Sequence, residues 1–248
     1  MNNLILSIDQ GTGGTKTVLF ETDGGVVAKA AVSLQSHYPQ VGFVEQDPDE
    51  LYKNVLASVR LCIDKAVQQD RNVPNRIVAA GVSNQRETFL LWDKTGTPLC
   101  RAVVWQCKRA VPICERLKGT SVEAEIRART GLIMDPYFSG AKLAWLMEND
   151  PVAKEAVHSG KACFGTVDTW LLYRLTNGGS YFTDYTNASR TLLFNIHTLD
   201  WDEILLNAFG AAGLVLPKAA PSSFSYGASD FEGLFPKPIP ITGMIGDS

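Results

Sequence analysis

The chain has 248 residues, 45% of them hydrophobic, and a formal net charge of −3. This composition supports a sizeable core in one large or two smaller domains, and it supplies no general basic field for nucleic acid or an anionic membrane. No apolar run approaches the roughly 18 residues of a membrane span. The five cysteines form no Cys-x-x-Cys pair and the N-terminus lacks a signal-peptide pattern, so we expect a protein of the reducing cytoplasm.

A glycine-rich loop follows the first predicted strand. Residues 4–8 are an apolar run that leads into Asp9, a carboxylate able to hold a divalent cation. Glycines let backbone N–H groups approach an anion closely, and the hydroxyls and the ammonium of this loop add donors. The candidate phosphate-binding residues are Thr12, Gly13, Gly14, Thr15 and Lys16. The loop matches neither a P-loop nor a dinucleotide fingerprint and joins two antiparallel strands, so an ordinary hairpin turn is the alternative.

The next elements are predicted from apolar spacing. Residues 17–22 and 25–32 form two strands around an Asp-Gly turn, and apolar residues at helical spacing indicate a helix from residue 51 to about residue 69. Residues 77–82 form a short buried strand, and a polar segment, residues 83–88, follows it immediately. Ligands of open α/β sheets bind at the carboxyl ends of strands, so this polar segment is a candidate binding site.

The second half of the chain is predicted to be mostly helical. Residues 112–151 follow a helical pattern with a break at residues 131–140, and a strand at 161–165 leads into a capped helix. Residues 218–240 are rich in Pro, Ser and Gly, which predicts a long surface connection. The chain then ends on an apolar strand followed by Gly246, Asp247 and Ser248. Because domains usually end on a surface element, we expect further residues after it in the natural protein.

Six separated segments resemble the FGGY carbohydrate kinases, and within that family the glycerol kinase group. They occur in family order from the start of the chain to its end, which makes the resemblance more specific than any single motif. The segments begin with Asp9-Gln10-Gly11-Thr12, Asn84-Gln85-Arg86-Glu87-Thr88 and Val104-Trp105-Gln106, and continue with residues 130–142, residues 165–190 and Gly246-Asp247.

The resemblance implies an α/β fold, the ribonuclease H-like or actin-like N-terminal domain, with a mixed sheet and flanking helices. Residues 1–248 would form the polyol-binding lobe, and the C-terminal lobe, which carries most nucleotide contacts in the family, is absent from this chain. The implied activity is transfer of the γ-phosphate of ATP to a primary hydroxyl of glycerol or a related polyol.

The resemblance also implies roles for individual residues. Asp247 corresponds to the general base that takes the proton of the attacking hydroxyl. Arg86 and Glu87 would bracket neighbouring hydroxyls, because a cationic donor lies beside an anionic acceptor. The remaining predicted polyol-binding residues are Trp105, as an apolar wall, Tyr137 and Ser248, together with Asp247 itself.

The implied cofactors are ATP and Mg²⁺, with Asp9 as the metal-binding carboxylate. The loop departs from glycerol kinases at Gly13, Gly14 and Lys16, which predicts weaker or differently shaped nucleotide binding. Residues 231–240 are short, so we expect no loop for inhibition by a sugar bisphosphate. A small polyol, glycerol first, is the expected partner; nucleic acid and membrane are not, and a homo-oligomer is compatible with the sequence.

Other interpretations stay open on the sequence alone. The Arg86-Glu87 pair has the composition of a solvated surface pair, Asp247 could cap a following helix, and Asp9 could start a turn. At the level of function, the alternatives are a non-catalytic polyol-binding or regulatory kinase lobe, a kinase for another sugar such as a ketopentose, and another ATPase of the same fold.

Overall fold

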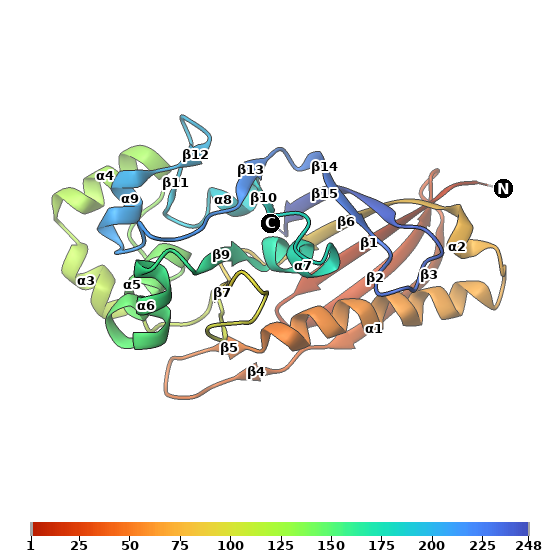
Figure 1. Cartoon of the computed structure of the whole chain (residues 1–248), viewed down its shortest axis with the longest axis horizontal. Coiled ribbons are helices and arrows are strands. Elements are labelled where there is room, and N and C mark those ends of the chain that lie inside the picture. Colours follow the sequence, from red (N-terminus) through yellow and green to blue (C-terminus); the bar gives the residue numbers. More distant parts are fainter. Residues whose placement is uncertain (1, 248) are drawn as a thin grey trace.

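The computed structural model describes residues 2–247 as an elongated molecule, with a six-stranded sheet at one end and a cluster of helices at the other (Figure 1). In chain order the elements are β1 (Leu4–Gly11), β2 (Gly14–Glu21), β3 (Val26–Ser33), β4 (Ser36–His37), β5 (Glu45–Gln46), α1 (Pro48–Val67), α2 (Val73–Arg76), β6 (Ile77–Asn84), β7 (Phe89–Trp92), β8 (Ala102–Val103), α3 (Val111–Leu117) and α4 (Ser121–Thr130). They continue with α5 (Ser139–Asn149), α6 (Pro151–His158), β9 (Cys163–Thr166), α7 (Val167–Leu175), β10 (Phe182–Asp184), α8 (Tyr185–Ala188), β11 (Phe194–Asn195), β12 (Asp200–Trp201), α9 (Glu203–Ala208), β13 (Lys218–Ala220), β14 (Ser223–Ser229) and β15 (Ile239–Gly246).

The larger sheet is mixed and has the strand order β14-β15-β6-β1-β2-β3. Its central strands β1, β6 and β15 run parallel to one another, whereas β2, β3 and β14 run antiparallel to their neighbours. The carboxyl ends of the three parallel strands therefore lie at the same edge. The predicted fold class, an α/β domain with a mixed sheet and flanking helices, is confirmed.

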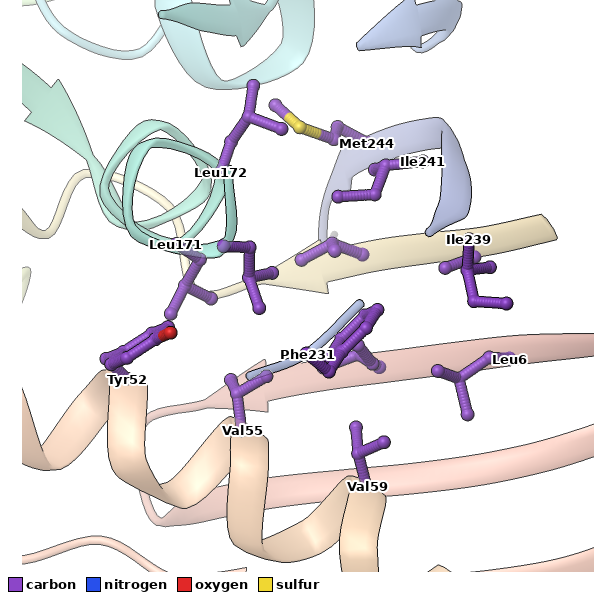
Figure 2. Close-up of a cluster of buried hydrophobic side chains, with 14 of the residues drawn as sticks. Leu6, Tyr52, Val55, Val59, Leu171, Leu172, Phe231, Ile239, Ile241 and Met244 are labelled. Carbon is purple, nitrogen blue, oxygen red and sulfur yellow. The ribbon is translucent and has the colours of Figure 1, made fainter. Parts of the chain in front are cut away.

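Helix α1 covers one face of this sheet. Asp47 caps its N-terminus by accepting hydrogen bonds from two backbone N–H groups, and Pro48 occupies the first turn, where no N–H is needed. The apolar residues predicted to share one helical face are buried, Val55 and Val59 completely. Figure 2 shows them meeting side chains of the strands, of α7 and of Phe231 in one core.

A second core fills the other end of the molecule. The region predicted to be helical divides into α3, α4, α5 and α6 at this end of the molecule (Figure 1), and these helices share buried side chains with the five-stranded sheet β4-β5-β8-β7-β9. Gly131 ends α4 in the left-handed conformation, with φ of 70°, a helix end that glycine favours. Within residues 2–247, no helix combines the length and apolarity needed to cross a bilayer.

Two local predictions differ from the structure. The predicted surface connection, residues 218–240, contains β13 and β14, because β14 pairs antiparallel with β15 and buries Tyr226. The predicted second strand starts earlier, at Gly14, so the glycine-rich loop contracts to a two-residue turn at Thr12 and Gly13.

Candidate active site

The predicted site residues gather at the carboxyl ends of β1, β6 and β15. Asp9 on β1 is paired in register with Ser83 on β6, and Ser83 is paired with Ile245 on β15. One residue further along, β15 ends at Gly246, and Asp247 follows. The sheet thus brings together segments that are more than 70 and more than 150 residues apart in the sequence.

Asp9 is exposed, and its carboxylate accepts a hydrogen bond of 2.8 Å from the Ser83 hydroxyl. Lys16 is its register partner on β2 and is also exposed. A carboxylate beside an ammonium at the open edge of a sheet is suited to a metal–phosphate complex, because Mg²⁺ usually takes one or two protein carboxylates and the remaining oxygens from phosphate and water. Among residues 2–247, no cluster of three or more His, Cys, Asp or Glu side chains is placed to hold a metal by itself.

The turn after β1 contacts Trp105 and Gln85. The Thr12 hydroxyl accepts a hydrogen bond of 2.8 Å from the indole Nε1 of Trp105 and donates one of 3.2 Å to Gln85. The Thr12 carbonyl accepts a hydrogen bond from Gln46, and Gln46 accepts one from Gln85. A buried set of amides therefore holds the turn in place.

The other candidate phosphate residues occupy different environments. A side chain at Gly13 would meet no atom within 4 Å, so this part of the turn is open. At Gly14 a Cβ would lie 2.5 Å from the Val32 carbonyl oxygen, so the approach of β3 by itself requires this glycine. The Thr15 side chain is buried, and its hydroxyl donates to Gln10 at 2.6 Å. Phosphate binding by these residues stays a prediction.

Arg86 and Glu87 lie in a tight turn after β6. The backbone N–H of Thr88 donates to the Arg86 carbonyl at 2.7 Å, and Glu87 has a φ of 60°. A glutamate with positive φ is strained, and such strain concentrates at functional sites. Glu87 is only 1% exposed, which excludes the alternative of a solvated surface pair.

The charge of Glu87 is balanced across the site by Arg190. The Arg190 guanidinium donates to the Glu87 carboxylate at 2.6 Å. Burial raises the pKa of Glu87, while Arg190, followed by Arg86 and Lys142, opposes the rise. A carboxylate has about four lone-pair sites, so the hydrogen bond from Arg190 leaves Glu87 able to accept from a hydroxyl ligand.

Arg86 and Asp247 are brought together by Gly246. The Arg86 Nε lies 4.0 Å from the Asp247 carboxylate, and the side chain of Asp247 is 40% exposed. The stem of Arg86 lies directly against Gly246, where a Cβ would approach its Cδ to 2.2 Å. The base and the cation predicted from the sequence are therefore neighbours, just after the ends of β15 and β6. Ser248 lies outside the described residues.

Trp105 and Tyr137 form an aromatic wall beside this cluster. Their ring centroids are 5.4 Å apart, and the Arg190 guanidinium lies 5.8 Å from the Tyr137 ring. A hollow of about 350 Å³ opens next to the two rings and is lined by Trp105, Gln106, Cys107, Lys108, Asp135, Pro136 and Tyr137. An apolar wall next to a few convergent polar groups is the usual form of a small-molecule site.

Sequence reasoning did not identify Arg190 or Lys142 as site residues. Lys142 is fully buried, and its ammonium donates to the Tyr137 carbonyl. Both residues belong to segments that resemble the family, but neither has a neighbouring partner in the sequence. The Arg190 to Glu87 contact spans 103 residues, so only the fold reveals it.

Comparison with known proteins gives a consistent result. Residues 4–248 match the model of the FGGY family of carbohydrate kinases, N-terminal domain. The chain is 43% identical over 245 residues to glycerol kinase 1 of Thermotoga maritima, which aligns with 98% of this chain and 49% of the relative. It is 46% identical over 244 residues to glycerol kinase of Thermus brockianus, covering 98% of this chain and 48% of the relative.

A solved structure gives the same picture. The crystal structure of Plasmodium falciparum glycerol kinase with ADP superimposes with a TM-score of 0.88 at 32% identity, over 99% of this chain and 49% of that one. The chain thus spans about half the length of the relatives that it matches.

Proposed function

Because this chain belongs to the FGGY family of carbohydrate kinases, we propose that it is the N-terminal, polyol-binding lobe of an ATP-dependent kinase. The kinase transfers the γ-phosphate of ATP to a primary hydroxyl of glycerol or a related polyol. The relatives that match the chain are named glycerol kinases and are about twice its length, which supports a second lobe as the source of most nucleotide contacts.

The polyol lies between the charged turn and the aromatic wall. Glu87 accepts hydrogen bonds from hydroxyls and Arg86 donates to their oxygens, while Trp105 and Tyr137 contact the carbon chain. Arg190 fixes the Glu87 carboxylate at 2.6 Å, so little reorganisation is needed when the substrate binds. Positioning of this kind can supply ~7–11 kcal/mol of a barrier when the geometry is good.

Asp247 accepts the proton of the attacking hydroxyl. The hydroxyl oxygen forms a bond to the γ-phosphorus, the bond from this phosphorus to the bridging oxygen breaks, and ADP leaves. Arg86, 4.0 Å from the Asp247 carboxylate, orients it toward the same hydroxyl that Arg86 holds.

The phosphates lie along the open edge formed by Asp9 and the turn at Thr12 and Gly13. Mg²⁺ bound through Asp9 would neutralise charge that develops on the phosphate oxygens. The exposed carboxylate of Asp9 and the open space at Gly13 fit such a complex. The bond between Trp105 and the Thr12 hydroxyl links this turn to the polyol wall.

The observation that carries the proposal is the contact of Arg86 with both Gly246 and Asp247. It supports the proposal because the Arg86 cation lies beside a partly exposed carboxylate at the end of the sheet. A non-catalytic polyol-binding lobe would need the cation but not the neighbouring base.

The test uses the whole natural protein that contains these residues, with ATP, Mg²⁺ and a panel of polyols and sugars. We expect phosphorylation of glycerol, and Asp247→Asn should lower kcat by ~10²–10⁴-fold. Asp64→Asn, an exposed carboxylate on α1, is the control and should leave kcat unchanged.

Three outcomes would contradict the proposal in different ways. Undiminished turnover in Asp247→Asn would remove this residue from its role. Activity on a ketopentose but not on glycerol would show that the proposed substrate is wrong. Polyol binding measured by calorimetry without any turnover would favour a non-catalytic lobe.

A further inference from the structure

We propose that Thr186 is a positioning residue for Asp247, and that the buried carboxylate of Asp184 sets its orientation. This inference rests on the proposed function, because it concerns the base of the same reaction. It does not require Thr186 to touch the substrate or the nucleotide.

Two consecutive backbone groups hold the end of β15. The N–H of Gly246 donates to the Thr186 hydroxyl at 2.7 Å, and the N–H of Asp247 donates to the Asn84 carbonyl at 3.0 Å. The Asp247 side chain is 40% exposed, so side-chain packing constrains it little. The position of its backbone therefore determines where the carboxylate lies.

The direction of the Thr186 hydroxyl is fixed by its second partner. A threonine hydroxyl has a single proton, and Thr186 donates it to the Asp184 carboxylate at 2.7 Å. A lone pair is then left facing the Gly246 N–H. The Thr186 hydroxyl therefore donates to Asp184 and accepts from Gly246.

Asp184 is itself held on several sides. It is completely buried, it caps the short helix α8 by accepting from the N–H groups of Thr186 and Asn187, and it accepts a further bond from the Ser222 hydroxyl. Its own N–H donates to the carboxylate of Asp168 at 3.2 Å. Donors from several directions therefore hold this carboxylate in one orientation.

The Asn84 residue, whose carbonyl accepts from the Asp247 N–H, is also linked to the Asp184 carboxylate. The side-chain amides of Asn187 and Asn84 form two reciprocal hydrogen bonds, of 2.8 and 3.1 Å, and both residues are completely buried. Asn187 also donates to Asp184 at 2.8 Å. The Asn84 carbonyl that accepts from Asp247 is thus part of the network that orients Thr186.

A second threonine, Thr176, allows an effect on the position of Asp247 to be distinguished from an effect on stability alone. Thr176, at the end of α7, makes the same kind of bonds, because its hydroxyl donates to the Leu172 carbonyl at 2.8 Å and accepts from the Ser180 N–H at 3.0 Å. Both threonines are half-buried. Only Thr186 makes its backbone contact next to Asp247, so Thr176 is a matched control.

The test compares Thr186→Val, Thr186→Ser and Thr176→Val in the whole natural protein, with glycerol and ATP. We expect Thr186→Val to lower kcat by about 10–100-fold, since a displacement of about 1 Å in a reacting group can cost 10²-fold, while KM for ATP stays within twofold. Thr186→Ser should recover most of the loss, and Thr176→Val should keep the wild-type kcat at a similar change in melting temperature.

A double variant shows whether Thr186 acts through Asp247. In an Asp247→Asn background, Thr186→Val should change the residual rate by less than twofold, because its target is already removed. Should Thr186→Val fail to fold, Thr186→Ala removes the same acceptor and is expected to give the same loss.

Each remaining outcome decides against the inference. A wild-type kcat in Thr186→Val, an equal loss in Thr186→Ser, or an equal loss in Thr176→Val would overturn the positioning role while leaving the proposed function intact. No turnover by the wild-type protein with any polyol would overturn both.

Discussion

The side chain of Arg86 lies across Gly246, and this contact leaves no room for a Cβ at that position. A methyl group there would lie 2.2 Å from Cδ and 2.5 Å from Cγ of Arg86. The glycine is therefore explained by close approach of a neighbouring side chain, and the same approach brings the guanidinium within 4.0 Å of Asp247.

Gly246→Ala is expected to displace Arg86 and to weaken polyol binding. KM for glycerol should rise about tenfold or more, because the cation proposed to bind the polyol is moved while the fold is kept. The measurement is steady-state kinetics on the whole natural protein, with circular dichroism to monitor folding. Gly243→Ala, in the same strand but with its nearest atoms at 3.9 and 4.0 Å, should behave as wild type, and an equal rise in KM there would contradict the argument.

The ion pair between Glu87 and Arg190 should stabilise the fold as well as the site. Glu87→Gln leaves Arg190 without its carboxylate in a largely buried setting, so we expect the free energy of unfolding to fall by about 3 kcal/mol. Glu125 forms a pair of nearly equal length with Arg129, 2.7 Å against 2.6 Å, but is 48% exposed. Glu125→Gln should therefore change stability by no more than ~0.5 kcal/mol. If urea unfolding showed equal losses of unfolding free energy in Glu87→Gln and Glu125→Gln, burial would not determine how much an ion pair contributes to stability.

Much of the site follows from local sequence, and the rest depends on contacts between distant segments. The helix from Pro48 and the strand before Arg86 could be predicted because their apolar residues repeat at regular spacing. The strand β14 was missed because Ser and Gly dominate it, and these residues also indicate loops. Its pairing with β15 stabilises it, and pairing of this kind is not encoded locally.

The same distinction applies to individual site residues. Arg86, Glu87 and Asp247 could be selected because the segments that carry them resemble the kinase family, and because these segments follow predicted strands. The role of Thr186 could not, because its hydroxyl is oriented by Asp184 and accepts from a strand that starts more than 50 residues later. A threonine in a short helix has no distinguishing signal until the fold places its partners.

The hydrogen bond between Trp105 and Thr12 predicts energetic coupling between the aromatic wall and the turn at Thr12 and Gly13. Trp105→Phe keeps an aromatic surface but removes the Nε1 donor, and Thr12→Val removes the acceptor of that 2.8 Å bond. The double variant should lose about 1 kcal/mol less transition-state stabilisation than the sum of the two single variants. The measurement is kcat/KM for glycerol in all four proteins; strictly additive losses would show that the bond carries no coupling.

Lys142 predicts how stability depends on pH. Burial lowers the pKa of its ammonium from the usual 10.5 to about 7, despite the opposing effects of Cys107 and Glu87. Between pH 7 and 10.5 the unfolded chain therefore binds more protons at this lysine than the folded chain does. Stability should consequently rise with pH across that window, by at most about 1.4 kcal/mol per pH unit, and the cost of burying the charge should be complete below pH 7.

Lys142→Met removes this titration while keeping a side chain of similar length. Urea unfolding between pH 6 and 9.5 should show the wild type gaining stability relative to Lys142→Met above pH 7, with a constant difference below it. Lys154→Met, at an exposed position on α6, should retain the wild-type pH dependence. Parallel curves for the wild type and Lys142→Met would mean that the buried ammonium remains protonated throughout, held by Glu87 and the Tyr137 carbonyl.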